Sequence, residues 1–116
     1  MTLGSLIRIL ETCPNKEFNV YFDFGNFSPD QVESYRGFYD QLAIGFSEGN
    51  TKVSELLGWL KDAVGGTFEG YKGGEFLMDE DTKMWVANYG KSNSTAVDSV
   101  EILTWAVIIR TRWEEI

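Results

Sequence analysis

The sequence predicts an α+β domain, with two helices packed on one face of a mainly antiparallel sheet. Two stretches carry apolar residues at helical spacing, and several others alternate apolar and polar residues with the period of a strand. The chain has 116 residues, 43% of them hydrophobic, and contains no linker, low-complexity segment or internal repeat. One domain spanning residues 1–116 is therefore expected.

The two helices are expected near the N-terminus and in the middle of the chain. Thr2 can cap the first helix and Pro14 ends it, while Asn50 or Thr51 can cap the second, which the glycine pair at 65–66 ends. The apolar stripe of the first comprises Leu3, Leu6, Ile7, Leu10 and Cys13. That of the second comprises Val53, Leu56, Leu57, Leu60, Ala63 and Val64.

The strands follow from period-two alternation and from β-branched and aromatic content. They are expected at residues 18–24, 41–47, 76–78, 83–88, 96–102 and 104–113. Ser28-Pro29-Asp30 resembles a helix N-cap with proline in first position, which predicts a single helical turn there. Residues 65–74 hold five glycines and predict a loop with a short extended piece, and residues 90–94 predict a polar turn.

The expected core draws on both helices and on the first and last strands. Its members are Leu6, Leu10, Phe22, Phe24, Leu56, Leu60, Val107 and Ile109. Core packing is also the usual reason for tryptophan, and the chain has Trp59, Trp85, Trp105 and Trp113.

Composition excludes several classes of function. The net charge is −8, which disfavours direct binding to nucleic acid or to anionic membranes, because both need clustered cations. The absence of histidine excludes His-based triads and His-ligated metals, and the single Cys13 allows no internal disulfide and no cysteine zinc site. We therefore expect no enzyme, no cofactor and no metal.

The N-terminus indicates a cytoplasmic protein. Arg8 and Glu11 interrupt the first apolar stretch, which reads as a helix of the mature protein and not as an export signal. The longest unbroken apolar run, 105–109, is far shorter than a membrane span.

Two segments carry the candidate binding site. Residues 34–40 gather three aromatic rings around one arginine, and residues 65–74 form a glycine-rich loop. Arg36 and Lys72 are scarce cations in an acidic chain, each next to a tyrosine and a glycine, which suits recognition of a carboxylate or another anion. The candidate binding residues are Tyr35, Arg36, Tyr39, Asp40, Glu69, Tyr71, Lys72 and Glu75. The alternatives are that Arg36 pairs internally with Asp40 and that the glycines form only a flexible connection.

Three stretches resemble segments of small, uncharacterised bacteriophage accessory proteins. They are SYRGFYDQLAIGF at 34–46, TFEGYKGGEFLM at 67–78 and MWVANYG at 84–90, about the middle half of the chain. The resemblance implies a phage-encoded protein that acts in the cytoplasm of a bacterial host.

Three functions are then open. The first is an inhibitor that binds a host protein directly, such as a CRISPR or other defence enzyme with a basic nucleic-acid cleft that acidic side chains could occupy. The second is a module that sequesters a nucleotide or other small molecule between the segment 35–40 and the loop 65–74. The third, least favoured, is a carboxylate-based enzyme. The final strand also leaves edge-to-edge homodimer formation open.

Overall fold

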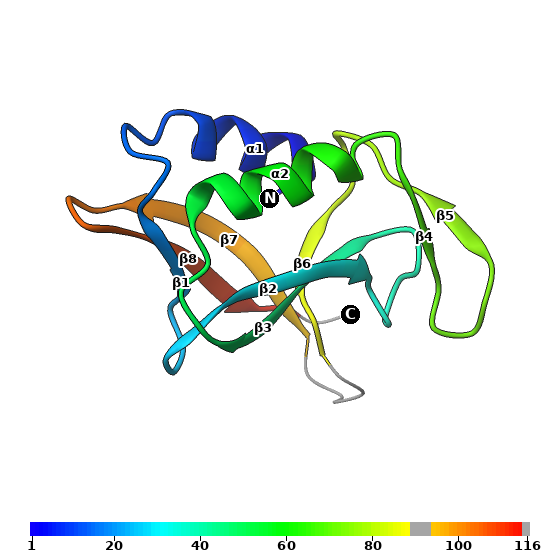
Figure 1. Cartoon of the computed structure of the whole chain (residues 1–116). Helices are drawn as coiled ribbons and strands as arrows, with labels where there is room; N and C mark the ends of the chain where they lie inside the picture. Colours follow the sequence, from blue (N-terminus) through cyan, green and yellow to red (C-terminus); the bar gives the residue numbers. More distant parts are fainter. Residues whose placement is uncertain (89–93, 115–116) are drawn as a thin grey trace.

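The computed structural model describes residues 1–88 and 94–114 (Figure 1). The predicted turn at 90–94 thus lies outside the described residues except for Ser94. The elements in chain order are α1 (Leu3–Glu11), β1 (Asn19–Phe22), β2 (Phe27–Ser34), β3 (Leu42–Glu48), α2 (Val53–Ala63), β4 (Thr67–Glu69), β5 (Glu75–Leu77), β6 (Met84–Val86), β7 (Thr95–Ile102) and β8 (Ala106–Trp113). The class is α+β, as the sequence predicts.

The main sheet is mixed and barrel-like, which corrects the mainly antiparallel sheet expected from the sequence. Its six strands run in the order β1-β8-β7-β6-β3-β2, with β1–β8 and β3–β6 parallel and the other three pairs antiparallel. Strands β4 and β5 form a separate antiparallel hairpin. Period-two alternation predicts where strands lie but not whether paired strands run parallel or antiparallel. The two parallel pairs could therefore not be predicted from it.

One buried serine joins the two edges of the sheet. Ser28 on β2 donates from Oγ to the carbonyl oxygen of Val20 on β1, at 2.7 Å. The same Oγ accepts from the backbone N–H of Thr51, at 3.0 Å, and the Val20 N–H donates to the Thr51 carbonyl, at 2.8 Å. Edge strands β1 and β2 therefore lie close together, and the sheet curls nearly into a barrel.

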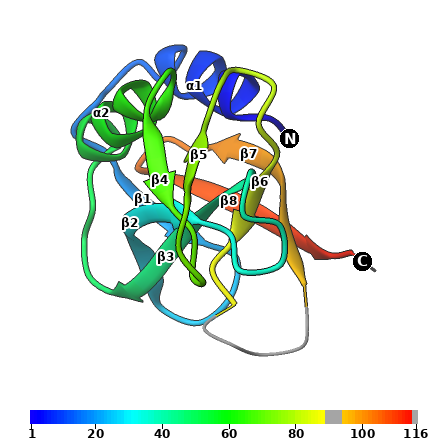
Figure 2. The ribbon, with the colours of Figure 1, turned by 90° about the vertical axis from the view of Figure 1, so that its right-hand side faces the viewer.

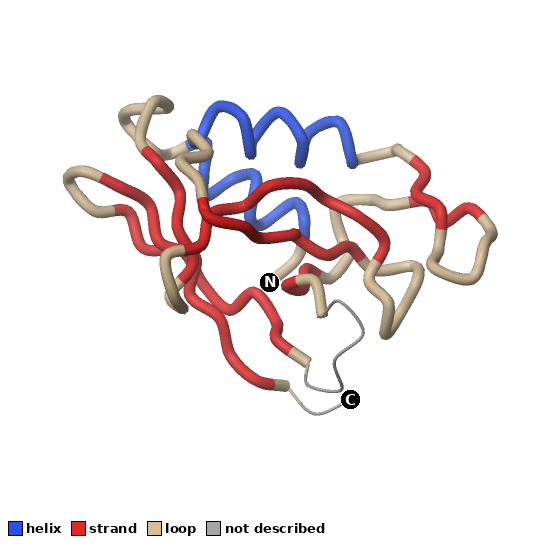
Figure 3. The backbone as a smooth tube through the Cα atoms, turned by 60° about the horizontal axis from the view of Figure 1, so that its bottom comes forward, coloured by secondary structure: helices blue, strands red, loops and turns tan. Residues whose placement is uncertain are grey.

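Both helices lie on the same side of the curled sheet (Figures 2 and 3). Thr2 caps α1 as predicted, because its Oγ1 accepts from the Ser5 N–H at 3.2 Å. The cap of α2 falls at Lys52, whose N–H donates to the Glu55 side chain at 3.1 Å. Thr51, one of the two predicted caps, instead donates its hydroxyl to the carbonyl of Pro29. Among the described residues, neither helix is long and apolar enough to cross a membrane.

The main core lies between the helices and the facing side of the sheet. The buried members of the predicted core are Leu6, Leu10, Phe22, Leu56, Leu60, Val107 and Ile109. Phe24 is half-buried and packs against them. The helical stripes and the strand alternation thus identify these core residues. Val64, predicted in the second stripe, instead lies at the C-cap of α2 and is exposed.

A second, smaller cluster occupies the opposite face of the sheet. Its buried members are Tyr35, Ala43, Trp85, Ala87 and Ala96. Alternation along β6 explains it, because Met84 and Val86 face the main core and Trp85 faces the other way. The Tyr35 and Trp85 rings stack at 4.6 Å between centroids and 3° between planes, and Trp85 Nε1 donates to Gln41 Oε1 at 2.5 Å.

Two further expectations from the sequence are wrong. Ser28-Pro29-Asp30 lies in strand β2 and not in a helical turn, with the proline at an irregularity of the β2–β3 pairing, where a missing N–H is tolerated. Trp105 and Trp113 are 64% and 66% exposed and not in the core. Both belong to the same series of alternate residues as the core residues Val107 and Ile109. Trp105, however, precedes β8 and Trp113 ends it, so both lie beyond the part of the strand that the helices cover.

Candidate functional site

The structure brings together the two segments that the sequence singles out. Arg36, in the β2–β3 connection, places its guanidinium carbon 4.0 Å from the centroid of the Tyr71 ring, in the β4–β5 connection. Tyr71 is 64% exposed. This is a cation–π contact at the tip of a hairpin that extends from the body of the molecule (Figure 1).

Tyr39 fixes the hairpin against the β2–β3 connection. Its ring lies 5.8 Å from that of Phe76 on β5, and Tyr39 is half-buried. A Cβ on Gly70 would come within 2.8 Å of the Phe76 ring and 3.3 Å of Tyr39 Cγ, so the close approach requires glycine there. The glycine-rich loop is therefore packed at this point and is not only a flexible connection.

The other predicted binding residues lie on the same two connections or on the hairpin strands next to them. Asp40, Glu69, Lys72 and Glu75 are all exposed. Among the described residues Arg36 forms no ion pair with Asp40, and Lys72 forms none at all. We call Arg36, Tyr39, Asp40, Glu69, Tyr71, Lys72 and Glu75 the arm surface.

Tyr35 does not belong to the arm surface, which corrects its prediction as a binding residue. It is fully buried in the second cluster, and its N–H donates to the Gln41 carbonyl at 2.8 Å. A Cβ on Gly37 would lie 2.6 Å from Tyr35 Cε2, so Gly37 serves to cover this ring and not to admit a ligand. Among the described residues the Tyr35 hydroxyl has no hydrogen-bond partner.

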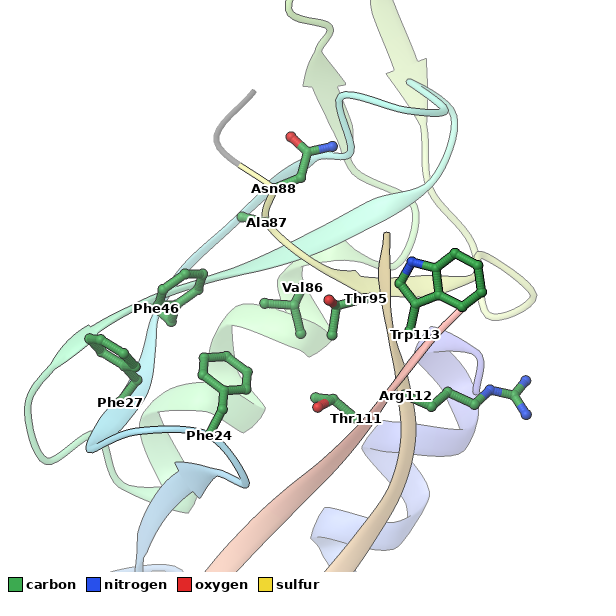
Figure 4. A pocket seen from close by; sticks show the side chains of 10 residues that line it. All are labelled: Phe24, Phe27, Phe46, Val86, Ala87, Asn88, Thr95, Thr111, Arg112 and Trp113. Atoms are coloured by element: carbon green, nitrogen blue, oxygen red, sulfur yellow. The ribbon is translucent and has the colours of Figure 1, made fainter. Parts of the chain in front are cut away.

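A hollow of about 450 Å³, which no pattern in the sequence indicates, lies at one end of the barrel-like sheet (Figure 4). It lies where β1, β3, β6 and β8 end and where β2 and β7 begin. Its lining residues are Phe24, Phe27, Phe46, Val86, Ala87, Asn88, Thr95, Thr111, Arg112 and Trp113.

One wall of this hollow is aromatic. Phe46 meets Phe24 edge to face at 5.3 Å and 85°, and meets Phe27 at 5.1 Å and 64°. All three phenylalanines are half-buried and line the hollow. Mutual packing of the three rings holds this wall in place without a bound ligand.

The facing wall is polar and held by hydrogen bonds. Thr111 donates its hydroxyl to Asp23 Oδ1 at 2.6 Å and its N–H to Oδ2 at 2.9 Å. Arg112 lies 3.6 Å from carboxylate oxygens of both Asp98 and Glu114, and its side chain points away from the phenylalanines (Figure 4). Lys83 and Arg112 lower the pKa of Glu114, the hydrogen bond from Lys83 being the larger cause.

The described part of the chain has no group of three or more acidic, histidine or cysteine residues that could hold a metal ion. Comparisons of the chain with models of protein families, with curated proteins and with solved structures found no match. The arm surface and the hollow are therefore the two candidate functional sites.

Proposed function

We propose that this protein binds and sequesters a planar heteroaromatic small molecule in the hollow at the end of the barrel-like sheet. The observation that carries the proposal is the pairing of a three-phenylalanine wall with a threonine-bearing wall across about 450 Å³. Pockets for small molecules are typically of roughly 300–1,000 Å³, mostly apolar, with a few convergent polar groups.

The lining restricts the chemistry of the ligand. An aromatic ring gains stacking and edge-to-face contacts with Phe24 and Phe27, while Thr95 offers a hydroxyl to a polar ring edge. Arg112 already faces two carboxylates, and the chain carries −8, so a polyphosphate would meet net repulsion. The favoured ligand is a nucleobase, a nucleoside or a cyclic mononucleotide with a single negative charge.

The side chains around the hollow favour binding of the ligand over its chemical conversion. The chain has no histidine, and its one cysteine, Cys13, is buried in the core away from the hollow. In the phage context that the sequence resemblance implies, binding of this kind would lower the free concentration of a host signalling molecule.

The test is a melting-temperature screen followed by calorimetry. We expect one class among nucleobases, nucleosides and cyclic mononucleotides to raise the melting temperature, whereas ATP does not. A ligand at 100 times its Kd stabilises a protein by about 2.7 kcal/mol, which is readily measured.

The variant Phe27→Leu should weaken binding of that ligand, because it removes a ring from the hollow. Phe76→Leu is the matched control, since Phe76 packs in the hairpin outside the hollow. A panel that leaves the melting temperature unchanged, or equal binding by the two variants, would contradict the proposal.

A second candidate function is direct inhibition of a host protein through the arm surface. The observation that favours it is the exposed Arg36–Tyr71 contact, since arginine and tyrosine are enriched at binding hot spots. The acidic chain fits a partner with a basic nucleic-acid cleft, such as a defence enzyme, and opposite charge would speed the encounter.

Affinity capture from bacterial lysate tests this second candidate. The double variant Arg36→Ala/Tyr71→Ala should lose a partner that the wild type retains, and the capture should weaken with salt. Arg8→Ala, which removes an exposed arginine of α1, is the control for charge. Capture by the double variant at the wild-type level would exclude the arm surface as the inhibitory site.

A further inference from the structure

A separate groove of about 340 Å³ lies where β2, α2 and β4 meet. Figures 1 and 2 show α2 and β4 beside β2, and Figure 2 shows these elements on the flank away from the chain termini. The lining residues are Asp30, Gln31, Val32, Trp59, Asp62, Ala63 and Phe68. Neither the hollow nor the arm surface includes any of them.

Two aromatic rings form the apolar part of the groove. Trp59 comes from α2 and Phe68 from β4, and both are half-buried. Each packs on the main core while part of its side chain stays accessible. Faces of tryptophan and phenylalanine attract cations, tryptophan most strongly.

Within the described residues, no cation of the protein forms an ion pair with the carboxylates of the groove. Asp30 and Asp62 are exposed, and within the described residues neither forms an ion pair. The cations that form ion pairs in the described part of the chain pair with other carboxylates: Lys52, Lys61, Lys83, Arg110 and Arg112.

The negative charge of Asp30 in the groove also affects the pKa of the nearby Glu33. Burial raises the pKa of Glu33, further along β2, and Asp30 adds to the rise while Arg36 opposes it. Arg36 itself lies over Tyr71 in the arm surface. The groove therefore offers aromatic faces and uncompensated carboxylates at the same place.

We propose that this groove binds an arginine side chain of a protein partner. A guanidinium can stack on the indole of Trp59 while its N–H groups donate to Asp30 or Asp62. Arginine suits the groove better than lysine, because its planar, weakly hydrated group both stacks and forms bidentate bonds with carboxylates. The inference is independent of the ligand proposed for the hollow.

The test is a titration followed by ¹⁵N-resolved NMR, with short blocked peptides as probes. The probe is acetyl-Gly-Arg-Gly-amide, and the control peptide replaces arginine with citrulline, which has nearly the same shape but no charge. We expect saturable shifts of amides in β2 and α2 with the arginine peptide only. Equal binding of the citrulline peptide, or no saturable shift, would overturn the proposal.

Substitutions then locate the site. Asp62→Asn should weaken binding of the arginine peptide about tenfold, the loss expected for one charge-assisted hydrogen bond. Asp81→Asn makes the same chemical change at an exposed turn outside the groove and should leave Kd unchanged. Equal Kd values for the two variants overturn the location, and equal binding of a lysine peptide overturns the assignment to arginine.

Discussion

Removal of the Ser28 hydroxyl should open the seam of the barrel-like sheet. Ser28 is 1% exposed, and its Oγ bonds the Val20 carbonyl at 2.7 Å and the Thr51 N–H at 3.0 Å. In Ser28→Ala both bonds are lost, and a backbone carbonyl and a backbone N–H lose a partner in the interior. Each such loss costs about 1–3 kcal/mol, and Thr51 is only half-buried, so we expect a total of about 2–4 kcal/mol.

The assay is chemical denaturation followed by circular dichroism, with Ser47→Ala as the matched control. Ser47 pairs with Ser28 across β2 and β3 but is exposed, so its substitution should change the free energy of unfolding by less than about 0.5 kcal/mol. If Ser28→Ala and Ser47→Ala were equally stable, the hydroxyl would not hold the two edges together, and our explanation of the closure would be refuted.

Three further predictions concern stability. Tyr35→Phe should raise the free energy of unfolding by about 1 kcal/mol, because it removes a buried hydroxyl without a partner among the described residues. A decrease of about 1 kcal/mol in urea unfolding would instead show that the hydroxyl has a hydrogen-bond partner. Leu60→Ala should cost roughly 2–5 kcal/mol in thermal or urea unfolding, and a cost below about 1 kcal/mol would place α2 outside the core. Because the pKa of Glu33 is raised in the folded state, the contribution of this side chain to stability falls as pH rises above the ordinary value of 4.5. Glu33→Gln should therefore be stabilising at pH 7 and neutral well below 4.5. Parallel pH profiles of the two proteins in urea unfolding would contradict this last expectation.

Local patterns in the sequence predict most elements of the fold but not its closure. The stripes through Leu6 and Leu60 identify both helices, because helical spacing is a local property. Ser28-Pro29 has the local chemistry of a helix start, yet the bond from Ser28 to Val20 joins two edges of the sheet and makes this segment a strand. Trp113 shares the alternation of the core residues in β8, and only the tertiary structure reveals that the helices do not extend over it.

The candidate sites could also be predicted only in part from the sequence. Scarce cations beside tyrosines led to Arg36 and Tyr71, which do meet. The same composition led to Tyr35, which the second face of the sheet buries. The hollow could not be predicted, since Phe27 and Phe46 come together with Thr111 only through the order of the strands.

The most direct test of sequestration in the hollow is an NMR map of the ligand that the melting screen selects. Binding should shift the amides of Phe27, Phe46, Thr95 and Thr111 and leave those of Tyr71 and Lys72 in place. Shifts confined to the hairpin around Tyr71, with none at the four lining residues, would contradict the proposed site and favour the arm surface instead.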